Sequence, residues 1–302
     1  MIVDKIPETD EKIIQLLKYN TLSVAEMVHF LREVKDKRLR DDYIATLKEP
    51  LRIYIIDGII RLCGSEEEKE AWNKKIVEIT DITKLNLEDL EKMPDDTMIR
   101  ICGEYTGSWQ RQLYTKDTYI KIVNKIDEIF GNIKSATKDD IKSEIITFMQ
   151  VCSKICKIRF DERTMVRPGI NDPELGVSSR NLEGGVLDNT CVCEGYSELL
   201  RNALISKGID AKFIKGTIKD GSTHAWNQVK IGGHWFNVDL TWAIKNHPEL
   251  VNSENPFIIE LLQTDEEFSE HDKYELYRPK EEKKCKKRIQ ELIRESGKEI
   301  EL

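Results

Sequence analysis

Apolar residues recur at helical spacing through much of the first 115 residues. Capping-box patterns, in which a serine precedes a glutamate by three positions, stand at residues 23–26 and 65–68 and are typical of helix starts. The apolar stripe after the first box consists of Val24, Met27, Val28, Leu31 and Val34. A short helix is predicted around residues 85–93, followed by a turn at residues 94–96. We therefore predict a helical N-terminal region over residues 1–115.

Two longer helices are predicted next, over residues 117–134 and 137–158. The second carries an apolar stripe made of Ile141, Ile145, Phe148, Met149, Cys152, Ile155 and Cys156. Cys152 and Cys156 are four residues apart, so both could reach one zinc ion. Within an apolar stripe, however, a free cysteine behaves as a small hydrophobic residue. We predict that these two cysteines pack in the core.

Residues 193–207 predict an amphipathic helix that begins at a cysteine. Its apolar positions are Tyr196, Leu199, Leu200, Ala203 and Leu204, at the spacing of one helix face. Gly208 follows, where helices often end in glycine. At the start of a helix, the unpaired backbone N–H groups and the helix dipole favour a thiolate on Cys193. Gly195 leaves room for another segment to approach the thiol.

Residues 223–242 predict two strands joined by a two-residue turn at Gly232-Gly233. This turn places Ile231 opposite His234 and thereby determines the pairing of the whole hairpin. One face of the hairpin is then apolar and is predicted to face the core. Its residues are Ala225, Val229, Ile231, Phe236, Val238 and Leu240.

The other face of the hairpin brings a histidine and a carboxylate together. The pairing places His224 opposite Thr241 and Asp239 opposite Trp226, so His224 and Asp239 are diagonal neighbours within hydrogen-bonding reach. With Cys193 they would supply the nucleophile, the base and the orienting acid of a Cys-His-Asp unit. From the residues alone, a purely structural interpretation stays open, in which the histidine and the aspartate only terminate strands.

The segments VCEGYSELLRNALISKGI and HAWNQVKIGGHWFNVDLTW resemble the core of the transglutaminase-like superfamily. This superfamily of papain-like fold includes transglutaminases, bacterial cysteine peptidases and peptide N-glycanases. The similarity covers roughly residues 105–272. It implies an α+β fold in which a central helix packs on an antiparallel sheet. It also implies that Cys193 is the nucleophile, His224 the base and Asp239 the orienting acid.

Several other residues near these motifs have open interpretations. Trp226 and Trp242 resemble aromatic positions that line the family's substrate cleft, although such tryptophans also pack in cores. Cys191 stands where the family more often has a small residue. It either packs or forms a redox disulfide with Cys193, and we favour packing because a one-residue spacer strains the disulfide ring. Three histidines have no partner pattern and are predicted at surface or turn positions: His234, His247 and His271.

Charge and cysteine content narrow the class of protein. The net charge of −8 provides no broad basic field, so nucleic acid is not an expected partner. The first residues lack the apolar segment of a signal peptide, and the longest apolar stretch, residues 52–63, is too short for a bilayer. Seven irregularly spaced cysteines do not form a disulfide framework. We expect a cytoplasmic protein without a membrane partner, with leaderless export left open.

Together these features predict a helical region at residues 1–115, a catalytic core at 116–280 and a charged C-terminal helix at 281–302. The resemblance implies a cysteine enzyme that acts on a peptide or side-chain amide through a thioester, without metal or organic cofactor. Hydrolysis, as in a peptidase or deamidase, is favoured over protein crosslinking. Two alternatives stay open: a catalytically silent binding module, and a zinc protein that uses Cys152, Cys156, Cys191 and Cys193.

Overall fold

The computed structural model describes most of the chain. The described residues are 7–19, 22, 24–47, 51–62, 65–79, 82, 85–101, 105–106, 112–162, 178–246 and 261–273. The predicted helix at 281–302 lies outside these residues, as do Ser23 of the first capping box and His247. No helix among the described residues has the length and apolar character needed to cross a membrane.

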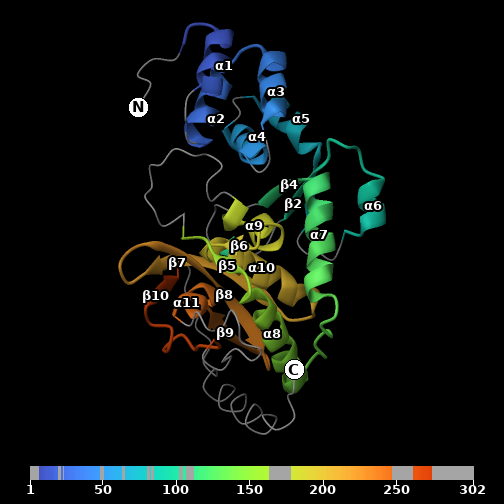
Figure 1. The fold of residues 1–302 in the computed structure, drawn as a ribbon, viewed down its shortest axis with the longest axis vertical. Helices are drawn as coiled ribbons and strands as arrows, with labels where there is room; N and C mark the ends of the chain where they lie inside the picture. The colour runs from blue at the N-terminus through green and yellow to red at the C-terminus, as the bar shows by residue number, and fades with distance from the viewer. Residues whose placement is uncertain are drawn as a thin grey trace.

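Five helices form the N-terminal part and lie together at one end of the molecule (Figure 1). They are α1 (Asp10–Tyr19), α2 (Val24–Glu33), α3 (Lys37–Thr46), α4 (Leu51–Leu62) and α5 (Glu66–Asn73). Their inward faces share a hydrophobic cluster in which Leu31 and Ile55 are completely buried. The second capping box is confirmed as a helix start, because α5 begins directly after Ser65.

The prediction of a helical region up to residue 115 is wrong beyond α5. Three short strands pair there in the order β1 (Ile76–Ile79), β2 (Met98–Ile101) and β4 (Gln112–Thr115), and the predicted short helix lies between the first two as α6 (Leu87–Glu91). Each strand has four residues, too few to show a period of two against the helical background. Met98 packs on the N-terminal cluster and Ile99 on the main core, since successive strand side chains face opposite sides.

The two long helices follow as α7 (Lys116–Phe130) and α8 (Ile141–Ile155). Helix α8 starts four residues later than predicted, because Asp140 caps it through hydrogen bonds from two backbone N–H groups and Asp139 has a positive φ of 62°. Cys152 and Cys156 are completely buried in the main core. The prediction that these cysteines pack in the core is confirmed.

The main sheet pairs β10 (His271–Lys273), β7 (Ala211–Ile218), β8 (Thr223–Ile231) and β9 (His234–Val238) in that order, and β3 (Tyr105–Thr106) runs parallel to β7. The turn residues Gly232 and Gly233 have φ values of 58° and 81°, a conformation that favours glycine. Ile231 pairs with His234, and the predicted pairing continues to Asn227 and Val238. The predicted core face is buried throughout.

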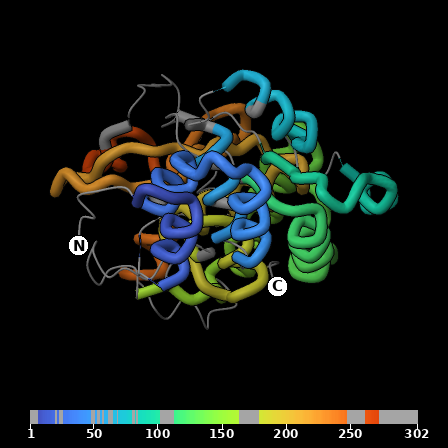
Figure 2. Tube along the Cα trace, turned by 90° about the horizontal axis from the view of Figure 1, so that it is seen from above, coloured from blue at the N-terminus to red at the C-terminus, as the bar shows by residue number. Residues whose placement is uncertain are grey.

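Helix α10 (Cys193–Ser206) is the central helix of the molecule, as Figures 1 and 2 show. It packs against β7 and β8 and is surrounded by α8, α9 (Leu182–Val186) and α11 (Leu240–Asn246). Every residue from 194 to 204 is buried, and Gly208 follows with a φ of 82°, as expected at a helix end. The predicted α+β class is confirmed, with a central helix on an antiparallel sheet.

Candidate active site

Cys193 is the first residue of the central helix. Its predecessor Val192 has an extended backbone, donates its N–H to Ser179 O at 2.9 Å and accepts the N–H of Tyr196 at 3.0 Å. The aliphatic side chain of Val192 provides no cap for the helix, so the first-turn N–H groups stay available to an anion beside the thiol. Cys193 is partly exposed, whereas the other described cysteines, Cys152, Cys156 and Cys191, are buried.

The first turn of α10 lies against the short 3-10 segment Ser178–Arg180. A Cβ on Gly195 would lie 2.3 Å from the carbonyl oxygen of Ser179 and 3.0 Å from the sulfur of Cys191. The sequence suggested that Gly195 lets another segment approach, and this segment is the backbone around Ser179. The same backbone binds Val192 and so holds the start of the helix in place.

We expect Gly195→Ala to destabilise the fold by about 1–3 kcal/mol, the usual cost of forcing a methyl group into a packed site. The carbonyl oxygen of Ser179 belongs to the backbone and cannot move away from a new methyl group as a flexible side chain can. Chemical denaturation of the variant and the parent protein measures this difference. A change of less than about 0.5 kcal/mol, as at an ordinary surface position, would show that the segment at Ser179 yields easily.

Cys191 fills a space between two glycines. A Cβ on Gly185 would lie 2.7 Å from its sulfur, close to the corresponding distance for Gly195. The side chain is completely buried, and burial together with nearby Asp161 raises the pKa of its thiol. This environment supports the packing interpretation over a resolving thiol, because thiolate is the form that exchanges disulfides.

Glu194 follows the cysteine, where its negative charge would oppose a neighbouring thiolate. Its buried carboxylate accepts from Lys215 Nζ at 2.9 Å and from Arg180 Nη1 at 3.2 Å. Lys215 lies on β7 and Arg180 in the 3-10 segment, so two cations from different elements compensate the charge of this acid.

His224 joins the other two predicted residues. It is buried on β8, and its Nε2 lies 2.6 Å from Asp239 Oδ2. The side chain of Cys193 also interacts with this ring and contributes to the raised pKa of His224. Since Nε2 is bonded to the carboxylate, Nδ1 is the ring nitrogen left for the thiol. The structure thus brings Cys193, His224 and Asp239 together.

Asp239 reaches His224 from a strand-to-helix junction. Strand β9 ends at Val238, and Asp239 Oδ1 accepts the backbone N–H of Trp242 at 3.1 Å in the first turn of α11. The predicted pairing of Thr241 with His224 is therefore wrong, because Thr241 belongs to this helix. The helix cap and the histidine bond hold different oxygens of the same carboxylate, which orients it.

The charged forms of His224 and Asp239 stabilise each other. Burial disfavours the imidazolium form of His224, but the hydrogen bonds with Asp239 and Cys193 outweigh it and raise its pKa to about 10. Burial likewise opposes ionisation of Asp239, yet hydrogen bonds from His224 and His271 hold its pKa below the usual value. An ionised carboxylate only accepts hydrogen bonds, so Nε2 of His224 carries a proton. With its pKa raised above neutral pH, His224 carries a second proton at Nδ1, which is the proton that the thiol of Cys193 gives up.

His271 is the site residue that the sequence did not reveal. Its Nε2 lies 3.1 Å from Asp239 Oδ2, and its side chain is only 1% exposed. The prediction of a surface or turn position is wrong for His271, because β10 pairs with the edge of β7 that lies away from β8 and thereby carries His271 into the site. No local pattern indicates this long-range pairing. His234, by contrast, is partly exposed at the hairpin turn.

Aromatic rings enclose the two histidines. Trp226 is 6.2 Å from His224 and 5.0 Å from His271, measured between ring centroids, and Phe268 stacks on His271 at 3.8 Å. Trp226 is completely buried, so it supports the site from the core and does not line the cleft surface as the resemblance implied. Trp242 is partly exposed, and its ring lies 6.1 Å from the His224 ring.

The described residues contain one group with the side chains that metals prefer, namely His224, Asp239 and His271, whose polar atoms lie within 4.8 Å of one another. Their separations of 2.6 and 3.1 Å are those of direct hydrogen bonds. No such group among the described residues contains the four cysteines of the zinc alternative.

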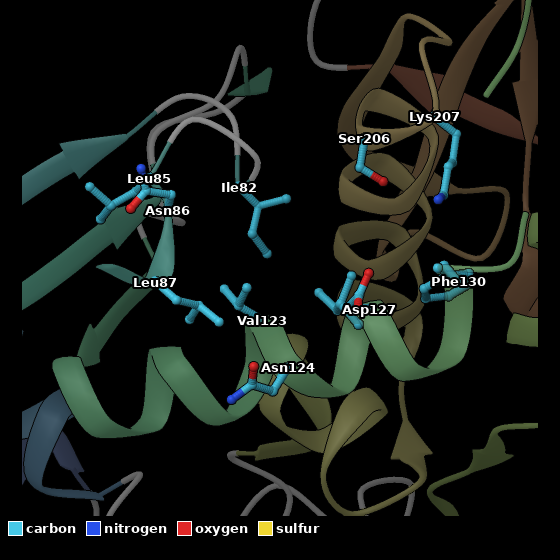
Figure 3. Close-up of a pocket in the computed structure, with 12 residues that line it drawn as sticks. Ile82, Leu85, Asn86, Leu87, Val123, Asn124, Asp127, Phe130, Ser206 and Lys207 are labelled. Carbon is cyan, nitrogen blue, oxygen red and sulfur yellow. The ribbon is translucent and has the colours of Figure 1, made fainter. Parts of the chain in front are cut away.

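A separate pocket of about 350 Å³ lies at the opposite end of α10 (Figure 3). It opens between α7 and residues 82 and 85–87, and Ser206 and Lys207 line it from the helix C-terminus. With a rise of 1.5 Å per residue, the length of α10 separates it from Cys193 by roughly 20 Å. This pocket is therefore distinct from the site at the helix start.

We expect iodoacetamide to alkylate Cys193 at neutral pH and to leave the buried cysteines unmodified. Burial raises the pKa of the thiols of Cys152, Cys156 and Cys191, whereas Cys193 is partly exposed beside His224. Peptide mapping after short exposure identifies the modified residues. Equal modification of Cys152 and Cys193 in the folded protein would contradict an activated thiol at the helix start.

Comparisons with known proteins identify a family and solved structures that this chain resembles. Residues 155–240 match the transglutaminase-like superfamily. A candidate cysteine protease from Cytophaga hutchinsonii aligns with a TM-score of 0.26 and 16% identity, over 39% of this chain and 36% of that structure. A TGase structure aligns with a TM-score of 0.28 and 14% identity, over 59% and 58%. The chain thus spans less than two thirds of either structure.

A comparison with curated proteins found no match. The superfamily match covers α10 and the hairpin and includes Cys193, His224 and Asp239. Residues 155–240 of this chain are thus similar in sequence to the transglutaminase-like superfamily.

Proposed function

We propose that this protein is a cysteine hydrolase that cleaves a peptide or side-chain amide through a thioester on Cys193. One observation carries the proposal: His224 Nε2 lies 2.6 Å from the carboxylate of Asp239, and its ring interacts with the side chain of Cys193, which contributes to its raised pKa. Each member comes from a different element, α10, β8 and the start of α11. A nucleophile, a base and an orienting acid in hydrogen-bond contact are the parts that acyl transfer requires.

In the first half of the reaction, the proton of the Cys193 thiol lies on Nδ1 of His224, whose raised pKa favours the imidazolium, and the sulfur attacks the amide carbon. The carbonyl π electrons move to oxygen, and the first-turn N–H groups of α10, beginning with that of Cys193, are placed to stabilise the oxyanion. When the C–N bond breaks, the imidazolium returns the proton to the departing nitrogen. The products are a free amine or ammonia and an acyl group on Cys193.

In the second half, water replaces the amine. His224 takes a proton from water as the oxygen attacks the thioester carbon, and the C–S bond breaks to release the carboxylic acid and restore the thiol. Asp239 stays ionised throughout and stabilises the imidazolium. Water needs no binding site of its own, whereas crosslinking needs a second site for an amine. Hydrolysis is therefore the simpler reaction for this unit.

The test compares the parent protein with Cys193→Ala on a peptide mixture, in the presence and absence of a primary amine. Cys156→Ala, which removes a core thiol, serves as control. Mass spectrometry identifies cleaved, deamidated or amine-modified peptides. We expect hydrolysed products that depend on Cys193 and persist without the amine. Products found only with the amine would indicate crosslinking, and equal products from Cys193→Ala would remove Cys193 from the chemistry.

A further inference from the structure

The carboxylate of Asp239 binds a second histidine besides the proposed base. Oδ2 of Asp239 lies 2.6 Å from His224 Nε2 and 3.1 Å from His271 Nε2, and Oδ1 accepts the N–H of Trp242. A carboxylate with a lowered pKa only accepts, so both imidazoles donate from Nε2. Both oxygens of Asp239 are thus held by donors from other elements.

The ring of His271 is held firmly by its surroundings. Its backbone N–H bonds to Phe268 O at 3.2 Å, the Phe268 ring stacks on it at 3.8 Å, and the Trp242 ring lies 4.4 Å away, both between centroids. Nδ1 of His271 is buried without a hydrogen-bond partner among the described residues. Burying a polar nitrogen without a partner is unfavourable. The hydrogen bond from Nε2 to Asp239 is therefore the favourable polar interaction that this ring position provides.

We propose that His271 is a positioning residue, which fixes the carboxylate of Asp239 so that Asp239 can orient His224. The inference rests on the proposed function, because positioning matters only if His224 serves Cys193. Without His271, Oδ2 would be held only by the imidazole that it must orient. With His271, the position of Oδ2 is set independently of the protonation changes on His224.

The electrostatic consequence concerns Asp239. The groups that face its carboxylate are His224 from β8, His271 from β10 and the N–H of Trp242 from α11, while Cys193 on α10 contacts it through His224. Donors lower the pKa of a carboxyl group. Removing the His271 donor therefore raises the pKa of Asp239. In the pH range where Asp239 then becomes protonated, the imidazolium of His224 loses its charged partner.

The experiment measures the rate of Cys193 alkylation by iodoacetamide against pH, which needs no substrate. His271→Phe keeps a ring in the aromatic enclosure and removes the donor, whereas His271→Gln keeps an N–H donor of similar reach. A hydrogen bond to a charged group is worth about 1.5 kcal/mol or more. We therefore expect His271→Phe to move the acid limb of the alkylation profile upward by about one unit, which slows alkylation roughly tenfold at a pH on that limb. His271→Gln should keep much of the parent alkylation rate and much of the parent position of the acid limb.

A purely structural role predicts a different pattern, in which both variants lower the melting temperature and leave the pH profile of the folded fraction unchanged. That result would overturn the inference while the parent profile still supported the proposed function. A parent profile that rises only with ordinary thiol titration would instead contradict the proposed function itself. Zinc bound stoichiometrically by the parent protein and lost in His271→Phe would also overturn positioning, since His271 would then be a metal ligand.

A measurement on the parent protein covers the case in which His271→Phe does not fold. Long-range ¹H–¹⁵N spectra report which ring nitrogen carries the proton. We expect a proton on Nε2 of His271, bonded to Asp239, and none on Nδ1. A neutral ring with its proton on Nδ1 could not donate to the carboxylate, and would contradict the inference without any variant.

Discussion

Alanine at Cys193, at His224 or at both positions is expected to reduce amide hydrolysis to one common residual level. The thiol and the imidazole act in the same step, so either loss removes thioester formation and the second loss adds little. By analogy with other nucleophile–base units, the decrease should be about 10⁶-fold. Independent contributions would instead multiply in the double variant.

The measurement is a double-mutant cycle on the rate of thioester formation, followed in single turnovers with a substrate from the peptide screen. His234→Ala is the matched control, because this histidine is partly exposed at the hairpin turn and has no contact with Asp239 among those described. We expect the control to retain the parent rate. A double variant much slower than either single variant would show that the two residues act separately and would contradict the proposed unit.

The local parts of this site could be predicted from sequence because their signals are local. Gly232 and Gly233 determine the hairpin pairing, and that pairing brings Val238, the neighbour of Asp239, opposite Asn227 on the strand that carries His224. The apolar spacing from Tyr196 to Leu204 predicts α10 and puts Cys193 at its start. In each case the interval between informative residues is short, so turn chemistry and helical periodicity suffice.

The remaining parts depend on contacts distant in sequence. His271 enters the site through the pairing of β10 with β7, in which His271 lies opposite Ile218. No turn signal links segments so far apart in the chain. Asp239 meets His224 at the start of a helix and not within the ladder, since β9 stops one residue earlier. The four-residue strand β2 likewise shows no recognisable alternation in the sequence, although it separates the two hydrophobic clusters.

Asp239→Asn should reduce hydrolysis by about 10²- to 10⁴-fold, with the attacking thiol still present, a smaller loss than removal of Cys193 or His224. The asparagine oxygen can still accept the N–H of Trp242, and the amide nitrogen then faces Nε2 of both histidines. An NH₂ group cannot accept from an N–H donor. His224 would therefore shift its proton to Nδ1, the nitrogen that must accept from Cys193.

The same substitution should also change the pH dependence of the reaction. In the parent protein, bonds to Asp239 and Cys193 raise the pKa of His224 to about 10 against the effect of burial. Without the carboxylate, burial is less opposed and the pKa falls, so the imidazolium that protonates the departing amine is lost at lower pH. We expect the alkaline limb of the kcat/KM profile to move downward in Asp239→Asn. Asp188→Asn, at an exposed position, should keep the parent profile, and an unchanged alkaline limb in Asp239→Asn would mean that Asp239 does not control the charge of His224.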